Sequence, residues 1–153
     1  HISVEATTVG SGILLSQDVD IYEGETAAET VVRMLQNNGY SVDYTGNYET
    51  GFYLARISSE SNFVTGNIPE DLRTKLEEHG FEIYDFTPNS LGDYDFTKGS
   101  GWMYQVNGVY PNYGLSDYCF QNGDTLRLRF TLAYGADIGQ DMTGGSDNWG
   151  YEW

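Results

Sequence analysis

The chain has 153 residues, of which 7 are lysine or arginine and 23 are aspartate or glutamate, so its formal net charge is −16. A surface this negative repels phosphate backbones and anionic lipid, which argues against nucleic-acid binding and membrane docking. Hydrophobic residues make up 39% of the chain and aromatic residues 15%, enough for an ordered core in a single domain over residues 1–153.

The N-terminal segment predicts a β-hairpin. Apolar and polar side chains alternate over residues 2–9 with the period of two that is typical of a half-buried strand. Residues 10–12, Gly-Ser-Gly, supply a turn, and residues 13–22 form the second predicted strand.

A helix is predicted to begin at Thr26 and to end at Gly39. Thr26 and Glu29 make a capping box, in which the hydroxyl accepts from the Glu29 amide and the carboxylate reaches back to the cap. Apolar residues between 28 and 35 recur at spacings of three and four, which indicates one buried stripe. Gly39 suits a left-handed C-cap.

Two short strands and a second helix are expected next. The strands are predicted at residues 40–45 and 51–57. We expect Asn67 to cap the helix and Gly80 to end it. His79 then lies in the last turn, where a partial positive charge interacts favourably with the helix dipole.

The C-terminal half predicts more strands. Residues 81–86 are expected to form a strand and residues 87–101 a loop. Alternation over residues 102–106, followed by Asn107-Gly108, predicts a strand that enters a type I′ hairpin turn. Residues 125–132 alternate as well, which predicts an antiparallel strand with one buried face.

Together these elements predict an α+β fold. Strands open and close the chain and a capped helix lies between them, which favours helices packed on one face of a sheet. A hairpin, a helix and returning strands are typical of the β-grasp, so we expect a β-grasp-like mixed or antiparallel sheet with two helices on it. Residues 137–153, rich in glycine, aspartate and aromatic side chains, form a tail of the same domain.

Two adjoining segments carry a family resemblance: residues 99–108, GSGWMYQVNG, and residues 110–118, YPNYGLSDY. With residues 22–27, 51–57 and Gly123-Asp124 in support, residues 1–137 resemble the bacterial transcobalamin-like C-terminal domain family. This domain of unknown function is related to the β-grasp domain of the vitamin B12 carriers transcobalamin and intrinsic factor. The resemblance implies a β-grasp fold and a place in secreted or cell-surface proteins of Gram-positive bacteria.

The composition points to the same location. An acidic, lysine-poor chain rich in tyrosine, glycine, asparagine and threonine is typical of an extracellular bacterial protein. The chain begins at His1 without an initiator methionine or a signal peptide, so we expect a processed chain or an excised domain. No stretch approaches the roughly 20 apolar residues of a membrane span.

Aromatic and amide residues around the predicted hairpin are the first candidate site. Tryptophan and tyrosine offer flat faces with polar edges, and asparagine offers a donor and an acceptor, so such a surface can stack on a sugar or a corrin. The alternative is that Trp102 and Tyr104 form the buried face of a strand, whereas Tyr110 and Tyr113 are expected to be exposed. The candidate ligand-binding residues are Trp102, Tyr104, Asn107, Tyr110, Asn112 and Tyr113.

The acidic tail is the second candidate site. Calcium takes six to eight oxygen ligands, and a glycine-rich loop can fold carboxylates around it. The candidate metal ligands are Asp137, Asp141 and Asp147, and calcium is the one cofactor for which the sequence offers ligands. The alternative is ordinary turn chemistry, since no segment matches the EF-hand loop.

No catalytic arrangement is recognisable, so we expect that the protein is not an enzyme. The sequence contains no Ser/His/Asp arrangement and no phosphate-binding loop. No pair of carboxylates is distinguished by an apolar setting or a motif as the catalytic pair of a glycosidase. The single cysteine, Cys119, excludes an intrachain disulfide, and we expect it to be a semi-buried packing residue between two aromatic rings.

These observations predict a noncatalytic secreted or cell-surface binding module. Its aromatic and amide surface would recognise a glycan, a corrinoid-like small molecule or a surface protein. The alternative is a structural or adhesive domain of a larger surface protein, rigidified by calcium, with no small-molecule site.

Overall fold

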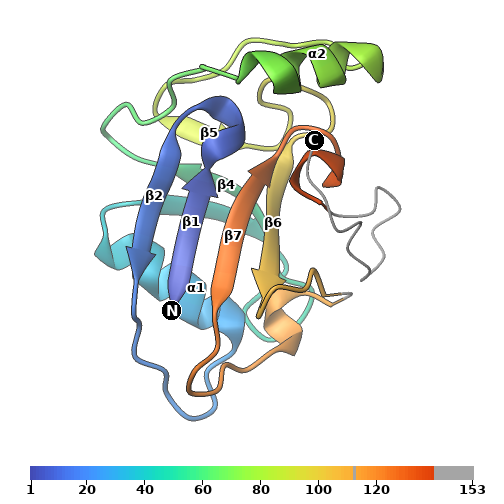
Figure 1. The fold of residues 1–153 in the computed structure, drawn as a ribbon. Coiled ribbons are helices and arrows are strands. Elements are labelled where there is room, and N and C mark those ends of the chain that lie inside the picture. The colour runs from blue at the N-terminus through green and yellow to red at the C-terminus, as the bar shows by residue number, and fades with distance from the viewer. Residues whose placement is uncertain (112, 140–153) are drawn as a thin grey trace.

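The computed structural model describes residues 1–111 and 113–139, drawn in Figure 1. Along the chain its elements are β1 (Ile2–Ala6), η1 (Thr7–Val9), β2 (Gly12–Gln17), α1 (Ala27–Asn37), β3 (Ser41–Thr45), β4 (Tyr53–Ser58), α2 (Glu70–Glu78), β5 (Ser90–Gly92), β6 (Gly101–Val106), η2 (Leu115–Asp117), β7 (Leu126–Thr131) and η3 (Ala136–Ile138). The prefix η marks a short 3₁₀ helix.

The strands form two sheets. The larger has the order β2-β1-β7-β6, in which β1 pairs antiparallel with β2 and parallel with β7, and β6 pairs antiparallel with β7. The smaller has the antiparallel order β3-β4-β5. Helix α1 crosses behind the larger sheet and α2 lies at its far end (Figure 1). The α+β class is confirmed and is consistent with a β-grasp-like arrangement, although the strands are divided between two sheets where one was expected.

Helix α1 forms where the capping pattern predicts it. The Thr26 hydroxyl accepts a hydrogen bond from the Glu29 amide at 3.4 Å. Val31 and Leu35 are fully buried and belong to the same core as Val4 and Leu128 of the larger sheet. The apolar stripe therefore covers one face of that sheet, and removing this surface from water is the main driving force for the packing.

The predicted start of the second helix is wrong. Pro69, not Asn67, occupies the N-cap of α2, and no side chain caps the helix. Glu70 and Asp71 lie in the first turn instead, where their charges interact favourably with the helix dipole. The helix ends just before Gly80, as expected: Glu78 is its last residue, His79 is the C-cap and Gly80 has a φ of +81°. His79 Nδ1 lies 2.8 Å from the Lys75 carbonyl oxygen.

The strand predicted at residues 81–86 is also wrong. This segment has no ladder, and the third strand of the smaller sheet lies at Ser90–Gly92, inside the predicted loop. A strand of three residues is too short to show an alternation of apolar and polar side chains in the sequence. It is a strand because its backbone pairs with β4. The predicted hairpin turn is confirmed: φ is +51° at Asn107 and +87° at Gly108, as a type I′ turn requires.

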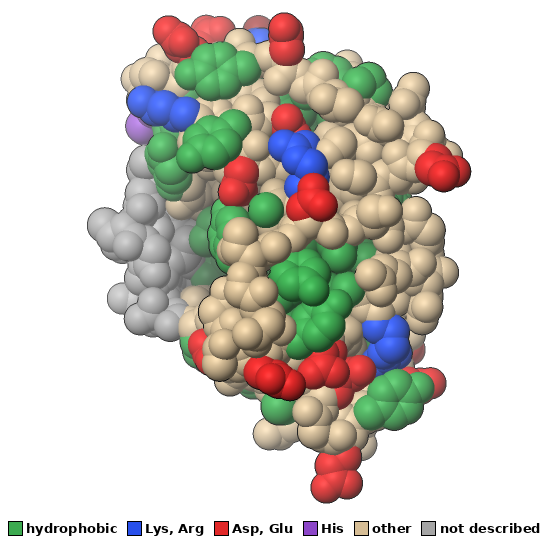
Figure 2. All heavy atoms as spheres, turned by 180° about the vertical axis from the view of Figure 1, so that it is seen from behind, with side chains coloured by type: hydrophobic (Ala, Val, Ile, Leu, Met, Phe, Trp, Pro, Cys, Tyr) green, Lys and Arg blue, Asp and Glu red, His purple; other side chains and the backbone are tan. Residues whose placement is uncertain are grey.

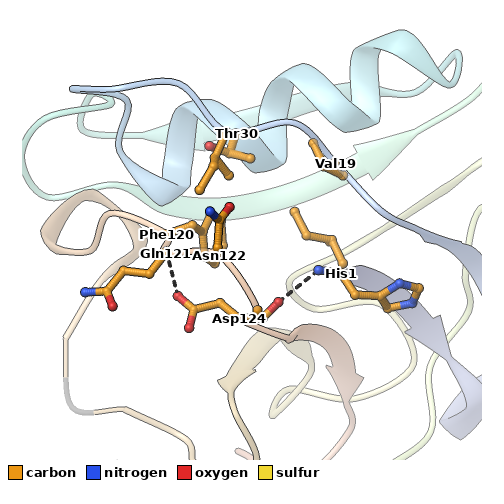
Figure 3. Close-up of a pocket in the computed structure, with 10 residues that line it drawn as sticks. His1, Val19, Thr30, Phe120, Gln121, Asn122 and Asp124 are labelled. Carbon is orange, nitrogen blue, oxygen red and sulfur yellow. Dashed lines mark hydrogen bonds between the residues drawn. The ribbon is translucent and has the colours of Figure 1, made fainter.

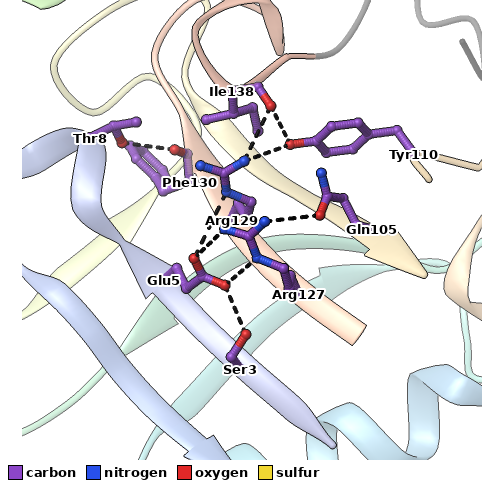
Figure 4. Close-up of polar contacts among 9 residues, drawn as sticks. All are labelled: Ser3, Glu5, Thr8, Gln105, Tyr110, Arg127, Arg129, Phe130 and Ile138. Carbon is purple, nitrogen blue, oxygen red and sulfur yellow. Dashed lines mark hydrogen bonds and ion pairs between the residues drawn. The ribbon is translucent and has the colours of Figure 1, made fainter. Parts of the chain in front are cut away.

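Strand β7 is buried on both faces, whereas one buried face was predicted. Leu126, Leu128 and Phe130 face the core, and on the other face Arg129 is only 4% exposed. The second face is buried because polar side chains of neighbouring segments cover it (Figure 4).

Glu5 of β1 neutralises the arginines on this second face. Its carboxylate accepts hydrogen bonds from Arg127 Nε and Nη2, both at 2.8 Å, and from the Ser3 hydroxyl at 2.8 Å. Arg129 Nε lies 4.0 Å from the same carboxylate. The bond from Arg127, supported by that from Ser3 and by both positive charges, holds the pKa of Glu5 below its usual 4.5 despite burial.

This geometry predicts a pH-dependent contribution of Glu5 to stability. Glu5→Gln should lower the free energy of unfolding at pH 7 by about 2–3 kcal/mol, because it leaves two arginines without their counter-charge. Since the folded-state pKa lies below the unfolded value, the contribution is complete above pH 4.5 and is lost as the pH falls through the folded-state pKa. Urea unfolding at several pH values measures this.

The exposed Glu82→Gln is the matched control and should change stability little at any pH. A difference between wild type and Glu5→Gln that stays constant down to pH 2.5 would contradict the proposed role of the charge.

Candidate functional site

An apolar groove of about 270 Å³ lies between β6 and the first residues of β4. We call it the aromatic groove. Its described walls come from four segments: the start of β4, strand β6, the loop and short helix that follow the hairpin turn, and one residue of β7. The described residues that line it are Phe52, Tyr53, Leu54, Trp102, Met103, Tyr104, Tyr110, Pro111, Tyr113, Gly114, Leu115 and Leu128.

Trp102 is the inner wall of the aromatic groove. The indole is only 5% exposed, and its Nε1 donates to the Leu91 carbonyl of β5 at 2.9 Å. The ring meets Phe130 edge-on, with centroids 5.2 Å apart. Trp102 thus connects the two sheets: it is buried, as the alternative of a core residue expected, and it also lines the groove, while its role in binding stays a prediction.

Tyr104 and Tyr113 both line the groove and contact each other. The Tyr104 hydroxyl donates to the Tyr113 carbonyl, which fixes the loop against β6. Tyr113 is 41% exposed, and its ring stacks on Tyr118 at 5.8 Å. Burial, together with the nearby Tyr113 and Asp117, raises the pKa of the Tyr104 phenol, so this ring is neutral at physiological pH.

Tyr53 forms the opposite wall with its hydroxyl bound to a carboxylate. It donates to Asp93 Oδ1 at 2.8 Å, and burial and this bond raise the pKa of the phenol. Burial also raises the pKa of Asp93. The neighbouring Asp95 forms an ion pair with Arg56 at 2.7 Å, which fixes this loop to β4.

The remaining predicted ligand-binding residues divide into three cases. Asn107 lies outside the aromatic groove and holds the turn, since its side chain donates to Asp124 at 3.0 Å and accepts from the Thr125 amide at 2.8 Å. Tyr110 lines the groove but is 2% exposed, so the expectation of an exposed ring is wrong. Asn112 lies outside the described residues.

Tyr110 is buried because its hydroxyl has two partners across the larger sheet. It donates to the Ile138 carbonyl at 2.6 Å and accepts from Arg129 Nη1 at 3.2 Å (Figure 4). Both partners lie far along the chain, so nothing in the local sequence indicates this burial.

Sequence reasoning missed the contribution of β4. Phe52, Tyr53 and Leu54 line the groove. From the sequence, residues 51–57 were predicted only to form a strand and to support the family resemblance. Tyr53 is 45% exposed and lies between buried Phe52 and Leu54, which is the alternation of a strand. A tyrosine at an exposed position of a strand is the feature of the sequence that could have indicated this wall of the groove.

Asp137, a predicted metal ligand, is 4% exposed and satisfied within the chain. One carboxylate oxygen accepts from the Thr131 hydroxyl and the other from the Leu132 amide, the latter at 2.7 Å. Burial raises the pKa of this carboxyl. Asp141 and Asp147 lie outside the described residues, and residues 1–111 and 113–139 contain no group of three potential acidic, histidine or cysteine ligands.

Two further hollows lie near residues 119–124. One, of about 70 Å³, is bounded by His1, Thr30 and Asn122 (Figure 3) and is far below the 300 Å³ or more of usual ligand pockets. The other is lined in part by Glu25 and Cys119. Cys119 is exposed, not semi-buried as expected, because Tyr118 and Phe120 on either side take the inward positions of an extended segment.

On the face shown in Figure 2, hydrophobic side chains reach the surface in patches bordered by acidic ones. Tyr44, Tyr48 and Phe52 form one ring cluster, with Tyr44 and Phe52 stacked at 5.0 Å. Phe52 is buried and also lines the aromatic groove, so this ring cluster adjoins the groove, and Tyr44 is its exposed member. In the described part of the chain, no helix has the length and apolar character needed to cross a membrane.

Residues 80–131 match the model of a family described as a domain of unknown function, DUF4430. This segment contains β5, β6 and β7 and the groove residues from Trp102 to Leu128. The match agrees with the predicted resemblance to a domain of unknown function in its most specific segment, while the relationship to transcobalamin stays a prediction. No curated protein matches the chain.

The contacts of Asp137 predict a structural role that does not depend on metal. Asp137→Ala should lower the free energy of unfolding by about 2–3 kcal/mol, because it leaves the buried Leu132 amide and Thr131 hydroxyl without their acceptor. Thermal melts in excess calcium and in EDTA should show the same loss. Exposed Asp85→Ala serves as the control, and a loss that appears only in calcium would instead support metal binding at the tail.

Proposed function

We propose that this protein is a noncatalytic binding module whose ligand occupies the aromatic groove. The observation that carries the proposal is the groove itself. An open hollow of about 270 Å³ lies between two sheets, and the described residues that line it include four tyrosines, a tryptophan and a phenylalanine and no charged residue.

The chemistry of the walls favours a neutral or cationic ligand with a flat or apolar face. Tyrosine and tryptophan rings stack on such faces, and each good contact contributes about 0.5–1.5 kcal/mol. The Tyr104 and Tyr53 hydroxyls are bound to the Tyr113 carbonyl and to Asp93, so the rings are held in place before a ligand arrives. The net charge of −16 disfavours anionic ligands.

We further propose that the module acts in a secreted or cell-surface protein of a Gram-positive bacterium and is related to the transcobalamin C-terminal domain. The residues of the hairpin segment and the acidic, lysine-poor composition support this proposal. Under it, a corrinoid-like molecule and a surface glycan are the first small molecules to examine. The calcium-rigidified alternative gains no support from Asp137, whose carboxylate oxygens are both hydrogen-bonded within the chain.

Substitution of Tyr113 tests the site. Tyr113→Ala removes a ring from the groove wall but keeps the backbone carbonyl that accepts from Tyr104. It should weaken binding of cobalamin or of the best ligand in a glycan panel by up to about tenfold, the value of one ring contact. Isothermal titration calorimetry measures this.

Tyr84→Ala is the matched control, because Tyr84 is exposed to a similar extent, 44% against 41%, and does not line the groove. Equal binding by wild type, Tyr113→Ala and Tyr84→Ala would place the ligand site elsewhere.

A further inference from the structure

Strand β6 is the edge of the larger sheet and borders the aromatic groove. In the order β2-β1-β7-β6, β7 is the one described strand with which it pairs, apart from the bridge between Val106 and Val109 at the hairpin turn. An edge strand presents a row of backbone donors and acceptors that another extended chain can pair with. The question is which groups of β6 face outward and what lies beside them.

Two bonds at the hairpin fix the direction of each β6 residue. The Asn107 amide donates toward β7, to the Thr125 carbonyl at 2.8 Å. The Val106 amide donates the opposite way, to Val109 at 2.9 Å. Since directions alternate along an antiparallel strand without a bulge, the amides and carbonyls of Trp102 and Tyr104 point away from β7.

These outward groups have no backbone partner within residues 1–111 and 113–139. They comprise two donors and two acceptors, on residues separated by about 6.8 Å along the strand. Both residues line the aromatic groove, so the unpaired edge opens into a hollow of about 270 Å³. An extended peptide laid there would satisfy up to four backbone groups and place its alternate side chains against the groove rings.

The charges around the groove select among peptides. Asp93 stands at the start of β6, where a Cβ added to Gly101 would lie 2.9 Å from its Oδ1. Asp117 stands at the loop wall, where a Cβ added to Gly114 would lie 3.9 Å from its Oδ2. No lysine or arginine is among the groove-lining residues that the structure describes, and tyrosine and tryptophan faces attract cations.

We propose that β6 binds an extended peptide segment carrying lysine or arginine side chains, which adds as a further strand along Trp102 and Tyr104 with its side chains in the aromatic groove. The proposal rests on the function proposed above and names the partner. Backbone pairing supplies affinity, and the groove rings with Asp93 and Asp117 supply the preference for basic residues.

A library of acetylated, amidated octapeptides tests the partner class. We expect the selected peptides to be enriched in lysine and arginine, and their acidic counterparts to bind at least about tenfold more weakly. Methylation of one peptide amide at a time should have an effect that alternates along the peptide. Binding should weaken about five- to tenfold where the methylated amide donates to β6, and should change little at the positions between.

Amide exchange measured by NMR gives an independent readout on the protein. Bound peptide should slow exchange of the Trp102 and Tyr104 amides about tenfold or more, while Met103 and Gln105, already directed toward β7, change little. A peptide that binds without this pattern, or whose N-methylated forms bind alike at every position, overturns strand addition.

Two variants of Tyr104 distinguish the contribution of its backbone amide to peptide binding from that of its ring. Tyr104→Pro and Tyr104→Ala both lose the phenol, but only proline removes the outward amide, and it sacrifices no bond to β7. Peptide binding should be at least about fivefold weaker in Tyr104→Pro than in Tyr104→Ala. If Tyr104→Pro fails to fold, the N-methyl series decides the question.

The failure of this inference is distinguishable from that of the proposed function. Binding of cobalamin or a glycan that Tyr113→Ala weakens, with no octapeptide bound, overturns the peptide proposal and leaves the binding module standing. No ligand of any class in the groove overturns both.

Discussion

The position of β7 between β1 and β6 is the constraint on which the rest of the structure depends. This pairing joins the beginning of the described chain to its end, because β1 starts at Ile2 and β7 ends at Thr131. Side chains also cover the second face of β7, so the arginines on that face need a counter-charge there. Glu5 supplies it from the neighbouring strand, and the bond to Arg127 links β1 to β7 directly. This arrangement fixes the position of the larger sheet and of its edge strand β6.

The aromatic groove exists because the two sheets do not merge. Strand β5 has three residues and pairs with β4 only from Arg56 onward, so Tyr53 and Leu54 extend past it and face β6. The Trp102 indole bonds to Leu91 where the sheets come together, and the rings farther along the strand line the opening. A short strand thus leaves a hollow that aromatic side chains fill only in part.

Features with local causes could be predicted from the sequence, and features that depend on distant partners could not. The Thr26 cap and the Asn107-Gly108 turn follow from neighbouring residues, and both were predicted. The burial of Tyr110 depends on Ile138 and Arg129, and the β4 wall of the groove depends on how two sheets meet. Residues 93–97 show the same limit: Tyr94 and Phe96 both have positive φ, which no pattern of residue types indicates. The bond from Arg56 to Asp95 holds the backbone between them.

Trp102 gives the protein a built-in optical reporter. Its indole is buried in the groove wall and hydrogen-bonded across the two sheets, so its emission responds to solvent entry and to any change in the distance between them. The other two tryptophans, Trp149 and Trp153, lie outside the described residues, and substitution of both by phenylalanine would leave Trp102 as the single tryptophan. With selective excitation of tryptophan over tyrosine, this single indole would then signal occupancy of the groove and separation of the sheets without any added label.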